Sequence, residues 1–421
     1  MNLVGDLQRF LVGKTARHTF WTMTGNAVNV LSVLLFTVVA TRLLSPTDYG
    51  VLTVALALFV IGFDIFDFGL SATLVRFVAG VARNQEWTKI SNFFASATLL
   101  RFIASLALLL LATLASIPLA HLFLHDKSQA SLIFLAVIGA ISLLWFNHFS
   151  ATLQGLQQFE KSSLLNICLG LSRMLLVFLI GLGPSLAFLI AAFVFSPIPA
   201  AMLGSLLIPR RVWFGVVTKD TTKQLVRFSG WLALFGILST LQSRLDVLML
   251  SSLQSPHQAG IYGAAFRLVS IFVLATASFG TVLVPKFSQI HHNELPLLIK
   301  KTLVGISLLL LAMAAAFLLA DTLVPLLATY QESVPLFRLL VIAHIPFVLS
   351  LPAMAALYTL NKPQVFAIIA FLQLVMTVGA NWLLIPLWGA VGAAITVGLA
   401  YLLGLVIVWI YVLAMVRKSN V

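Results

Sequence analysis

Charged residues are scarce in this sequence. They make up 9% of the 421 residues, hydrophobic residues make up 61%, and the mean hydropathy is +1.08. A soluble chain of this length needs a far larger charged surface, so this composition excludes a soluble globular protein. We expect a polytopic integral membrane protein.

Cysteine and acidic residues are also few. Cys168 is the single cysteine, which excludes a disulfide framework and a cysteine-rich metal site. The chain has 12 acidic and 25 basic residues, a formal charge of +13. An excess of this size can indicate nucleic-acid binding when it lies on a folded domain. Here most of the basic residues lie in short connections between apolar runs, so we expect no nucleic-acid partner.

Apolar runs fill most of the chain. About twelve of them are long enough to cross a ~30 Å hydrocarbon core. They lie near residues 20–42, 49–75, 92–115, 130–153, 163–181, 185–207, 227–250, 260–285, 300–320, 334–358, 365–386 and 389–415.

The basic residues of the loops predict the topology. Nearly all of them lie in the two tails or in loops that follow even-numbered runs, and only Lys127 lies clearly in a loop on the other side. The positive-inside rule then predicts that both termini are cytoplasmic. Residues 1–19 lack the apolar core and small-residue cleavage site of a signal peptide, so we expect no cleavable signal.

The first two runs are joined by a short hairpin whose pattern recurs in the second half. Its turn, 45–48, contains Pro46 and is closed by Gly50, a residue that tolerates positive φ. A duplication of six runs would give two parallel halves related by an axis along the membrane normal. The matched pairs are Leu43 and Leu253, Ser45 and Ser255, Pro46 and Pro256, and Gly50 and Gly260.

The repeat and a polar connector predict the domain organisation. We expect an N-terminal six-helix bundle at 1–208, a cytoplasmic linker at 209–226 and a C-terminal six-helix bundle at 227–421. The linker is the longest basic connector between apolar runs.

The basic residues in or beside the apolar runs are all arginines. Arginine binds phosphate in a bidentate manner, and a cation in a span requires a polar cavity or an anionic partner. Those near run ends could instead anchor a helix by reaching the interface. The central arginines are Arg101, Arg173, Arg244 and Arg267, and those nearer the ends are Arg42 and Arg338.

Three aspartates share these runs. Asp64 and Asp67 lie three residues apart and therefore on one helix face. Two neighbouring carboxylates repel at low dielectric, which favours exchange of a proton or a sodium ion; alternatively, either pairs with an intramembrane arginine. Asp246 and Arg244 lie on opposite sides of one helix, so each needs a partner elsewhere.

Four segments resemble the oligosaccharide flippases in their order and spacing. These flippases form the polysaccharide-transport branch of a superfamily that also contains multidrug exporters and the lipid II flippase. The resemblance covers about residues 20–415. The segments are DFGLSATLVR at 67–76, RLDVLML at 244–250, GIYGAAFRL at 260–268 and NWLLIPLWGAVGAAIT at 381–396.

This resemblance implies an all-α membrane protein, with two six-helix bundles around a central cavity that opens alternately to either side. It implies movement of undecaprenyl-diphosphate-linked oligosaccharide across the bacterial cytoplasmic membrane during O-antigen or exopolysaccharide synthesis. The partners would be the lipid-linked oligosaccharide, membrane lipid, and the polymerase and chain-length machinery. No cofactor is expected beyond a coupling H⁺ or Na⁺.

Under this interpretation the central arginines bind the diphosphate, with Arg42 and Arg338 as weaker candidates. Asp64, Asp67 and Asp246 are the candidate ion-coupling groups. Two alternatives stay open: an ion-coupled multidrug exporter of the same superfamily, and a membrane-embedded polysaccharide polymerase or ligase. The excess of arginine favours an anionic substrate, and the short outer loops argue against an enzyme.

Overall fold

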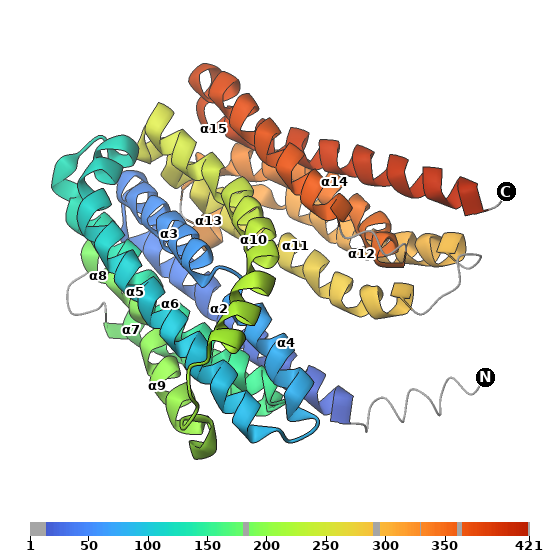
Figure 1. Cartoon of the computed structure of the whole chain (residues 1–421). Coiled ribbons are helices and arrows are strands. Elements are labelled where there is room, and N and C mark those ends of the chain that lie inside the picture. Colours follow the sequence, from blue (N-terminus) through green and yellow to red (C-terminus); the bar gives the residue numbers. More distant parts are fainter. Residues whose placement is uncertain (1–13, 180–184, 289–294, 329, 360–363, 420–421) are drawn as a thin grey trace. The chain divides into compact units, whose positions relative to one another are not determined.

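The computed structural model describes residues 14–179, 185–288, 295–328, 330–359 and 364–419 (Figure 1). All regular secondary structure in these ranges is helical. The α-helices are α2 (Lys14–Leu43), α3 (Pro46–Asp67), α4 (Leu70–Ala82), α5 (Trp87–Leu124), α6 (Ala130–Gly155), α7 (Phe159–Leu179), α8 (Leu186–Phe195), α9 (Pro197–Leu207), α10 (Lys219–Leu253), α11 (Pro256–Ser288), α12 (Leu295–Leu318), α13 (Ala320–Ala328), α14 (Ser333–Thr359) and α15 (Gln364–Ser419), and the short 3₁₀ helices are η1 (Lys127–Gln129) and η3 (Arg210–Val212).

Within these ranges, 11 helices are long and apolar enough to cross a membrane. The predicted all-α membrane fold is therefore confirmed. Helix α15 contains one non-helical residue, Gly389 at φ 55° and ψ −131°. Side chains of the α10–α11 hairpin supply hydrogen bonds to the backbone near this break. The Gln258 side chain accepts from the Ala390 N–H at 3.3 Å, and the Gln254 side chain donates to the Ile385 carbonyl at 3.0 Å. The count of twelve spans stays a prediction.

The expected single run at 49–75 is two helices. Helix α3 ends at Asp67, and Phe68 and Gly69 have positive φ angles of 49° and 66°. A left-handed pair cannot continue a right-handed helix, so α4 starts in a new direction. Gly69 also permits a close approach by α10, since a Cβ there would lie 2.8 Å from the Cβ of Leu232.

The chain forms two compact units, which interleave along the sequence. Helix α10 supplies its first part, up to Ile237, to the first unit and the rest to the second. The predicted linker and bundle boundaries stay predictions. The first unit contains Met1–Val39, Ala55–His121 and Asp126–Ile237, and the second contains Ala40–Val54, Leu122–His125 and Leu238–Val421.

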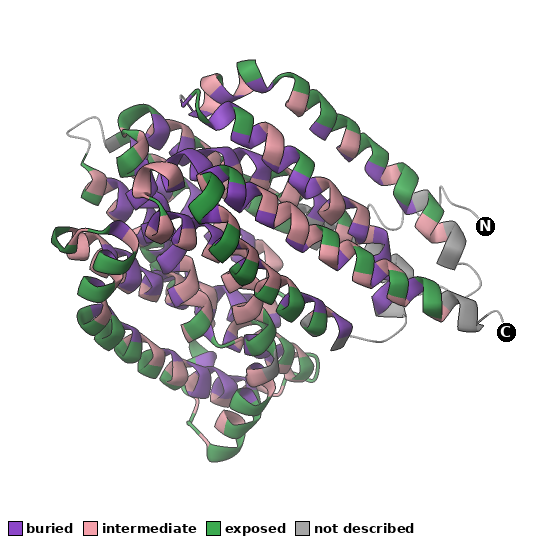
Figure 2. Cartoon of the chain, turned by 90° about the horizontal axis from the view of Figure 1, so that it is seen from above, coloured by how far each residue is buried: buried purple, intermediate pink, exposed green. Residues whose placement is uncertain are grey.

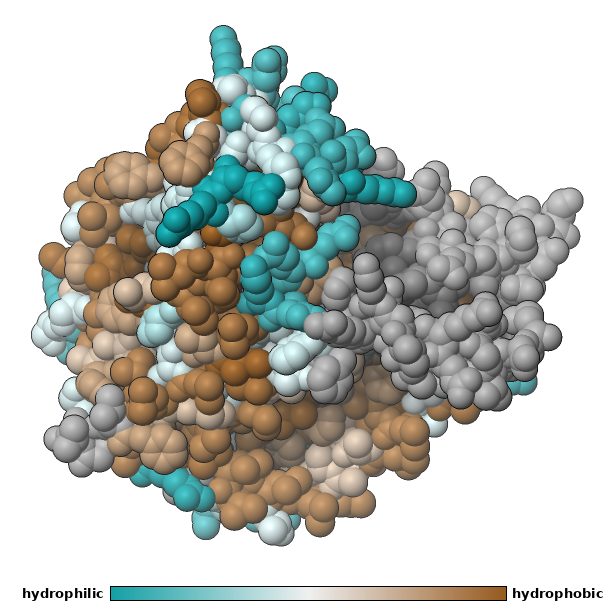
Figure 3. All heavy atoms as spheres, turned by 90° about the horizontal axis from the view of Figure 1, so that it is seen from below, coloured by the Kyte–Doolittle hydropathy of each residue, from teal (hydrophilic) through white to brown (hydrophobic). Residues whose placement is uncertain are grey.

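The core of the first unit joins α4, α5, α6, α7 and α9. Leu74, Ile90, Leu153 and Leu165 are fully buried in it. In Figure 2, buried residues follow the helix sides that meet other helices, and exposed residues follow the outer sides. Hydrophobic residues cover much of the visible surface in Figure 3, with hydrophilic residues gathered in patches. An apolar exterior of this kind matches a protein whose solvent is lipid.

In the second unit the starts of α3 and α11 cross at two glycines. A Cβ on Gly50 would overlap the carbonyl oxygen of Pro256, and one on Gly260 would overlap that of Pro46. Gly50 is helical, so the expectation that it closes a turn with positive φ was wrong; it allows a close approach. Each contact mirrors the other, as a parallel repeat would produce, although the repeat itself stays a prediction.

Candidate functional site

The break between α3 and α4 is organised by the carboxylate of Asp67. It accepts from the Oγ of Ser71 at 2.5 Å and from the Ser71 N–H at 3.3 Å. It therefore caps the first turn of α4, where backbone N–H groups have no helical partner. Arg101 of α5 donates through Nη2 to Asp67 at 2.5 Å and to the Oγ of Ser71 at 2.7 Å.

Arg101 and Asp67 form a buried ion pair. The Arg101 side chain is 1% exposed, and Asp67 is also buried. The alternative in which an aspartate pairs with an intramembrane arginine is thus confirmed for Asp67. The carboxylate balances the charge of Arg101, and the diphosphate-binding role of Arg101 stays a prediction. A pair like this holds the broken helix together, since loss of either partner leaves a buried charge uncompensated.

Asp64 lies one helical turn before Asp67 on α3 and is partly exposed. We expected Asp64 and Asp67 to repel each other as two free carboxylates. Asp67 is not free, because it pairs with Arg101 and accepts a hydrogen bond from Ser71. Any ion-coupling role of Asp64 stays a prediction.

Arg173 of α7 is a buried arginine that contacts α2 and α8. Its Nη1 donates to Oδ1 of Asn29 and to Oγ of Ser32 on α2, both at 3.0 Å. Its guanidinium lies 4.3 Å from the centre of the Phe193 ring, a cation–π contact. These contacts fix the position of the guanidinium.

The second unit holds Asp246 of α10 against α11. Tyr262 donates its hydroxyl hydrogen bond to the Asp246 carboxylate, which also accepts from the Val247 N–H at 2.8 Å. The prediction that Asp246 finds a partner on another helix is confirmed. The Nε of Arg244, two residues earlier, is buried and makes no hydrogen bond to the described residues.

Arg267 lies near the middle of the apolar span Pro256–Gly280 of α11 and is partly exposed. Its guanidinium makes no hydrogen bond or ion pair within the part of the chain that the structure describes. A cation at this depth is unfavourable in contact with hydrocarbon, so a polar environment or an anionic partner would stabilise it.

The two arginines near run ends have structural partners. Arg42 donates to the Leu326 carbonyl at 3.1 Å, which satisfies the last turn of α13. Arg338 pairs with Asp321 at 2.6 Å and donates to the Phe317 carbonyl at 3.3 Å. Both geometries fit the anchoring role that was the alternative to diphosphate binding.

Sequence reasoning missed a buried histidine in the first unit. His148 of α6 is fully buried, and its Nε2 lies 3.1 Å from Oγ1 of Thr98. The rings of Phe94, Trp145 and Phe149 surround it at 4.9, 5.7 and 5.3 Å. An ionisable residue inside an apolar run was the signal that could have found it. His344 of α14 is a second case, with Nδ1 2.7 Å from the Leu340 carbonyl.

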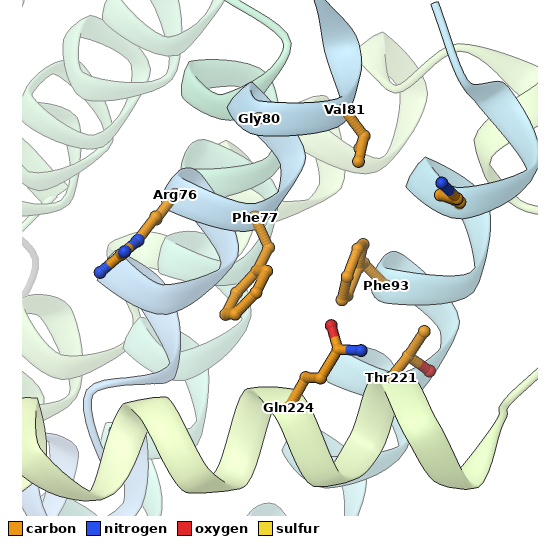
Figure 4. Close-up of a pocket in the computed structure, with 8 residues that line it drawn as sticks. Arg76, Phe77, Gly80, Val81, Phe93, Thr221 and Gln224 are labelled. Carbon is orange, nitrogen blue, oxygen red and sulfur yellow. The ribbon is translucent and has the colours of Figure 1, made fainter. Parts of the chain in front are cut away.

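A cavity of about 470 Å³ lies between α4, α5 and the start of α10 (Figure 4). Phe77 and Phe93 stack at its centre with ring centroids 5.1 Å apart, and the Gln224 amide points toward them. Arg76 extends away from this centre and lies over the Phe228 ring at 4.1 Å. The cavity is lined by two rings, an amide and the cations Arg76 and Lys89, and none of the predicted arginines lines it.

The arrangement divides the predicted residues by role. Asp67 with Arg101 fixes a helix break, Asp246 with Tyr262 joins two helices, and Arg42 and Arg338 anchor helix ends. Arg173 is held against α2 and the Phe193 ring, and the guanidinium of Arg267 makes no hydrogen bond or ion pair in the part of the chain that the structure describes. No group of three or more His, Cys, Asp or Glu side chains in the described ranges could hold a metal ion.

Known proteins share this sequence pattern and fold. The family described as polysaccharide biosynthesis protein matches residues 15–291. A putative O-antigen transporter of Shigella flexneri is 24% identical over 410 residues, 94% of this chain and 97% of that protein.

Solved structures agree on the fold. An inward-facing MATE-family multidrug transporter of the MOP superfamily has a TM-score of 0.79 at 14% identity, with 95% of this chain and 99% of that chain covered. The inward closed lipid II flippase MurJ has a TM-score of 0.75 at 12% identity, with 94% and 87% covered. These relatives are transporters and flippases by name, in agreement with the resemblance. The chain belongs to the polysaccharide biosynthesis protein family and has the fold of the MOP-superfamily transporters.

Proposed function

We propose that this protein moves an undecaprenyl-diphosphate-linked oligosaccharide from the cytoplasmic to the outer leaflet by alternating access. Membership of the polysaccharide biosynthesis family and the likeness to an O-antigen transporter support a saccharide substrate. The arginines within the spans supply the complement to the diphosphate of its lipid carrier.

One observation carries the proposal. Arg267 lies at mid-span and is partly exposed, and its guanidinium makes no hydrogen bond or ion pair with the described residues. Its insertion is unfavourable by ~2.5–3.5 kcal/mol unless a polar environment offsets it. An anionic substrate offsets this penalty, whereas a cationic drug adds to it. Arg173 of the first unit and Arg244 of the second unit stay further candidates for binding the diphosphate.

Ion coupling is the second part of the proposal. In this proposal, Asp67 releases Arg101 and binds H⁺ or Na⁺ when the α3–α4 break opens. Asp246 likewise binds the ion in place of its hydrogen bond from the Tyr262 hydroxyl. Asp64 lies close enough along α3 to receive the ion. Such a site couples an ion gradient to the conformation if the two conformations bind the ion with different affinity.

The proposed orientation follows the charges of the loops. Both termini and the basic connector 209–226 lie in the cytoplasm of a bacterial cell. The polymerase and chain-length machinery would receive the product at the outer leaflet.

Deletion of the gene tests this function directly. The deletion strain should accumulate lipid-linked oligosaccharide in the cytoplasmic leaflet, measured by its accessibility to an enzyme added to inverted and to right-side-out vesicles. Accumulation in the outer leaflet would contradict flipping and would indicate a polymerase or ligase. Unaltered lipid-linked oligosaccharide with increased drug sensitivity would indicate a multidrug exporter.

A further inference from the structure

A second cavity of the first unit lies beside α5. Its volume is about 360 Å³, and it is lined by Phe94, Thr98 and Phe102 of α5, Trp145 of α6 and Trp213 of the connector between α9 and α10. We call it the tryptophan groove. Its lining is almost entirely apolar, so it suits a hydrocarbon chain rather than a sugar or an ion.

Exposed apolar side chains of α5 continue from the groove. Leu99, Phe102, Ile103 and Leu106 are exposed and follow one another at the spacing of a single helix face. Lys89 and Asn92 are the last strongly polar side chains before this apolar face begins. The groove therefore starts at one edge of the hydrocarbon and runs into it.

Two cations precede Trp213, a residue of the groove, in the connector. Arg210 and Arg211 form η3 immediately before Trp213, and both are exposed. Neither has a carboxylate partner among the described residues. The guanidinium of Arg211 lies 4.1 Å from the centre of the Trp87 ring, which holds it beside the start of α5. This pair is a complement for a phosphate group.

The connector is fixed onto α5, so the cations and the groove keep their spacing. Val212 is fully buried, and the Val216 N–H donates to Oδ1 of Asn92 at 2.9 Å. The ring of Trp213 meets that of Phe94 at 5.1 Å. Phe214 is 83% exposed and Val216 67% exposed, which is typical of a segment that dips into a membrane interface.

We propose that the connector and the inner end of α5 form a binding site for one anionic phospholipid of the bilayer. Its phosphate lies between Arg210 and Arg211, and one acyl chain lies in the tryptophan groove. The exposed apolar side chains of α5 beside the groove suit contact with a bilayer, so a resident phospholipid fits the site better than a substrate in transit. This inference does not depend on the proposed function.

Native mass spectrometry of the full-length protein tests the site. The probes are phosphatidylglycerol, phosphatidylcholine and inorganic phosphate, added separately to delipidated protein. Phosphatidylglycerol should bind, and Arg210→Gln with Arg211→Gln should weaken its binding roughly tenfold or more. The matched control, Lys219→Gln with Lys223→Gln, removes two cations beyond Trp213 and should leave binding unchanged.

A second variant tests the groove itself. Ala95 also lines it, and Ala95→Phe should fill it and weaken phosphatidylglycerol binding with an unchanged melting temperature. Three results would overturn the proposal: equal binding by the arginine variant and its control, equal binding of phosphatidylcholine, or saturable binding of inorganic phosphate alone. Selective binding of a polyprenyl diphosphate in place of phosphatidylglycerol would also overturn it, because the site would then belong to the substrate.

Discussion

Gly50 and Gly260 pack against each other's helices so closely that neither position can carry a side chain. The amide nitrogen of Gly260 would lie 3.0 Å from a Cβ built on Gly50, and that of Gly50 would lie 2.9 Å from one built on Gly260. These are matched positions of the two hairpins in the predicted repeat. The close crossing of α3 and α11 thus requires glycine, which has no Cβ, at both positions.

Alanine at either glycine should therefore destabilise the second unit. The added Cβ meets backbone atoms, which cannot rotate away, so we expect a loss of about 1–3 kcal/mol and a lower melting temperature in detergent. Gly305→Ala is the matched control, because its Cβ meets nothing within 4 Å and alanine favours a helix. Equal melting temperatures for Gly50→Ala and Gly305→Ala would contradict the close approach.

The ion pair at the helix break predicts a non-additive effect. Arg101→Met and Asp67→Asn should each destabilise the protein by about 3–5 kcal/mol. The first leaves the buried Asp67 carboxylate without its cation, and the second leaves the buried Arg101 guanidinium without its carboxylate. The double variant should be more stable than the sum of the two losses predicts. Thermal unfolding of the wild type and the three variants measures the coupling, and strict additivity would show that the two side chains do not interact.

Arg267 should matter for transport and little for stability. Arg267→Ala should reduce restoration of surface polysaccharide in the deletion strain roughly tenfold or more, since an arginine–phosphate interaction is lost. Arg267→Lys should keep part of the activity, because it retains the charge without the fork.

Arg338→Ala is the control for this substitution. It removes an arginine of the same unit whose pair with Asp321 is partly exposed and is worth only ~0.2–1 kcal/mol. Its transport activity should stay close to that of the wild type. If Arg267→Ala restores polysaccharide as well as Arg338→Ala at equal expression, Arg267 does not bind the substrate.

Tyr262→Phe should weaken the contact between α10 and α11. Without the hydroxyl, the buried Asp246 carboxylate loses its side-chain donor, which costs about 1–3 kcal/mol. Asp246→Asn in the Tyr262→Phe background should recover part of this loss, because an amide is easier to bury than a carboxylate. Melting temperatures of the wild type and the two variants test this prediction. A Tyr262→Phe variant as stable as the wild type would show that the hydrogen bond between Tyr262 and Asp246 does not stabilise the protein.

Topology is checked by reporters fused after Lys219 and after Val421. Both should be active in the cytoplasm, because the basic residues gather on that side of the predicted spans. Activity outside the cell at either position would invert or break the predicted orientation.

The sequence by itself determined the class, the helical content and most of the spans. Long apolar runs have one stable solution in a bilayer, because each helix satisfies its own backbone hydrogen bonds. The expected run at 130–153 became α6 (Ala130–Gly155), and the run at 334–358 became α14 (Ser333–Thr359). The intramembrane arginines could also be identified from the sequence. The free-energy penalty of placing an arginine in a membrane span depends only on that residue and on the apolar run around it.

Only the tertiary structure decided which charges meet. The pairing of Asp67 with Arg101 joins α3 to α5, and that of Asp246 with Tyr262 joins α10 to α11. Local spacing cannot specify such contacts, because they depend on helix rotation and on the approach of neighbours. The break at Gly69 also depends on tertiary contacts. The Asp67 carboxylate caps the start of α4 next to the left-handed backbone. Because Gly69 has no Cβ, α10, which lies far along the chain, can approach it closely.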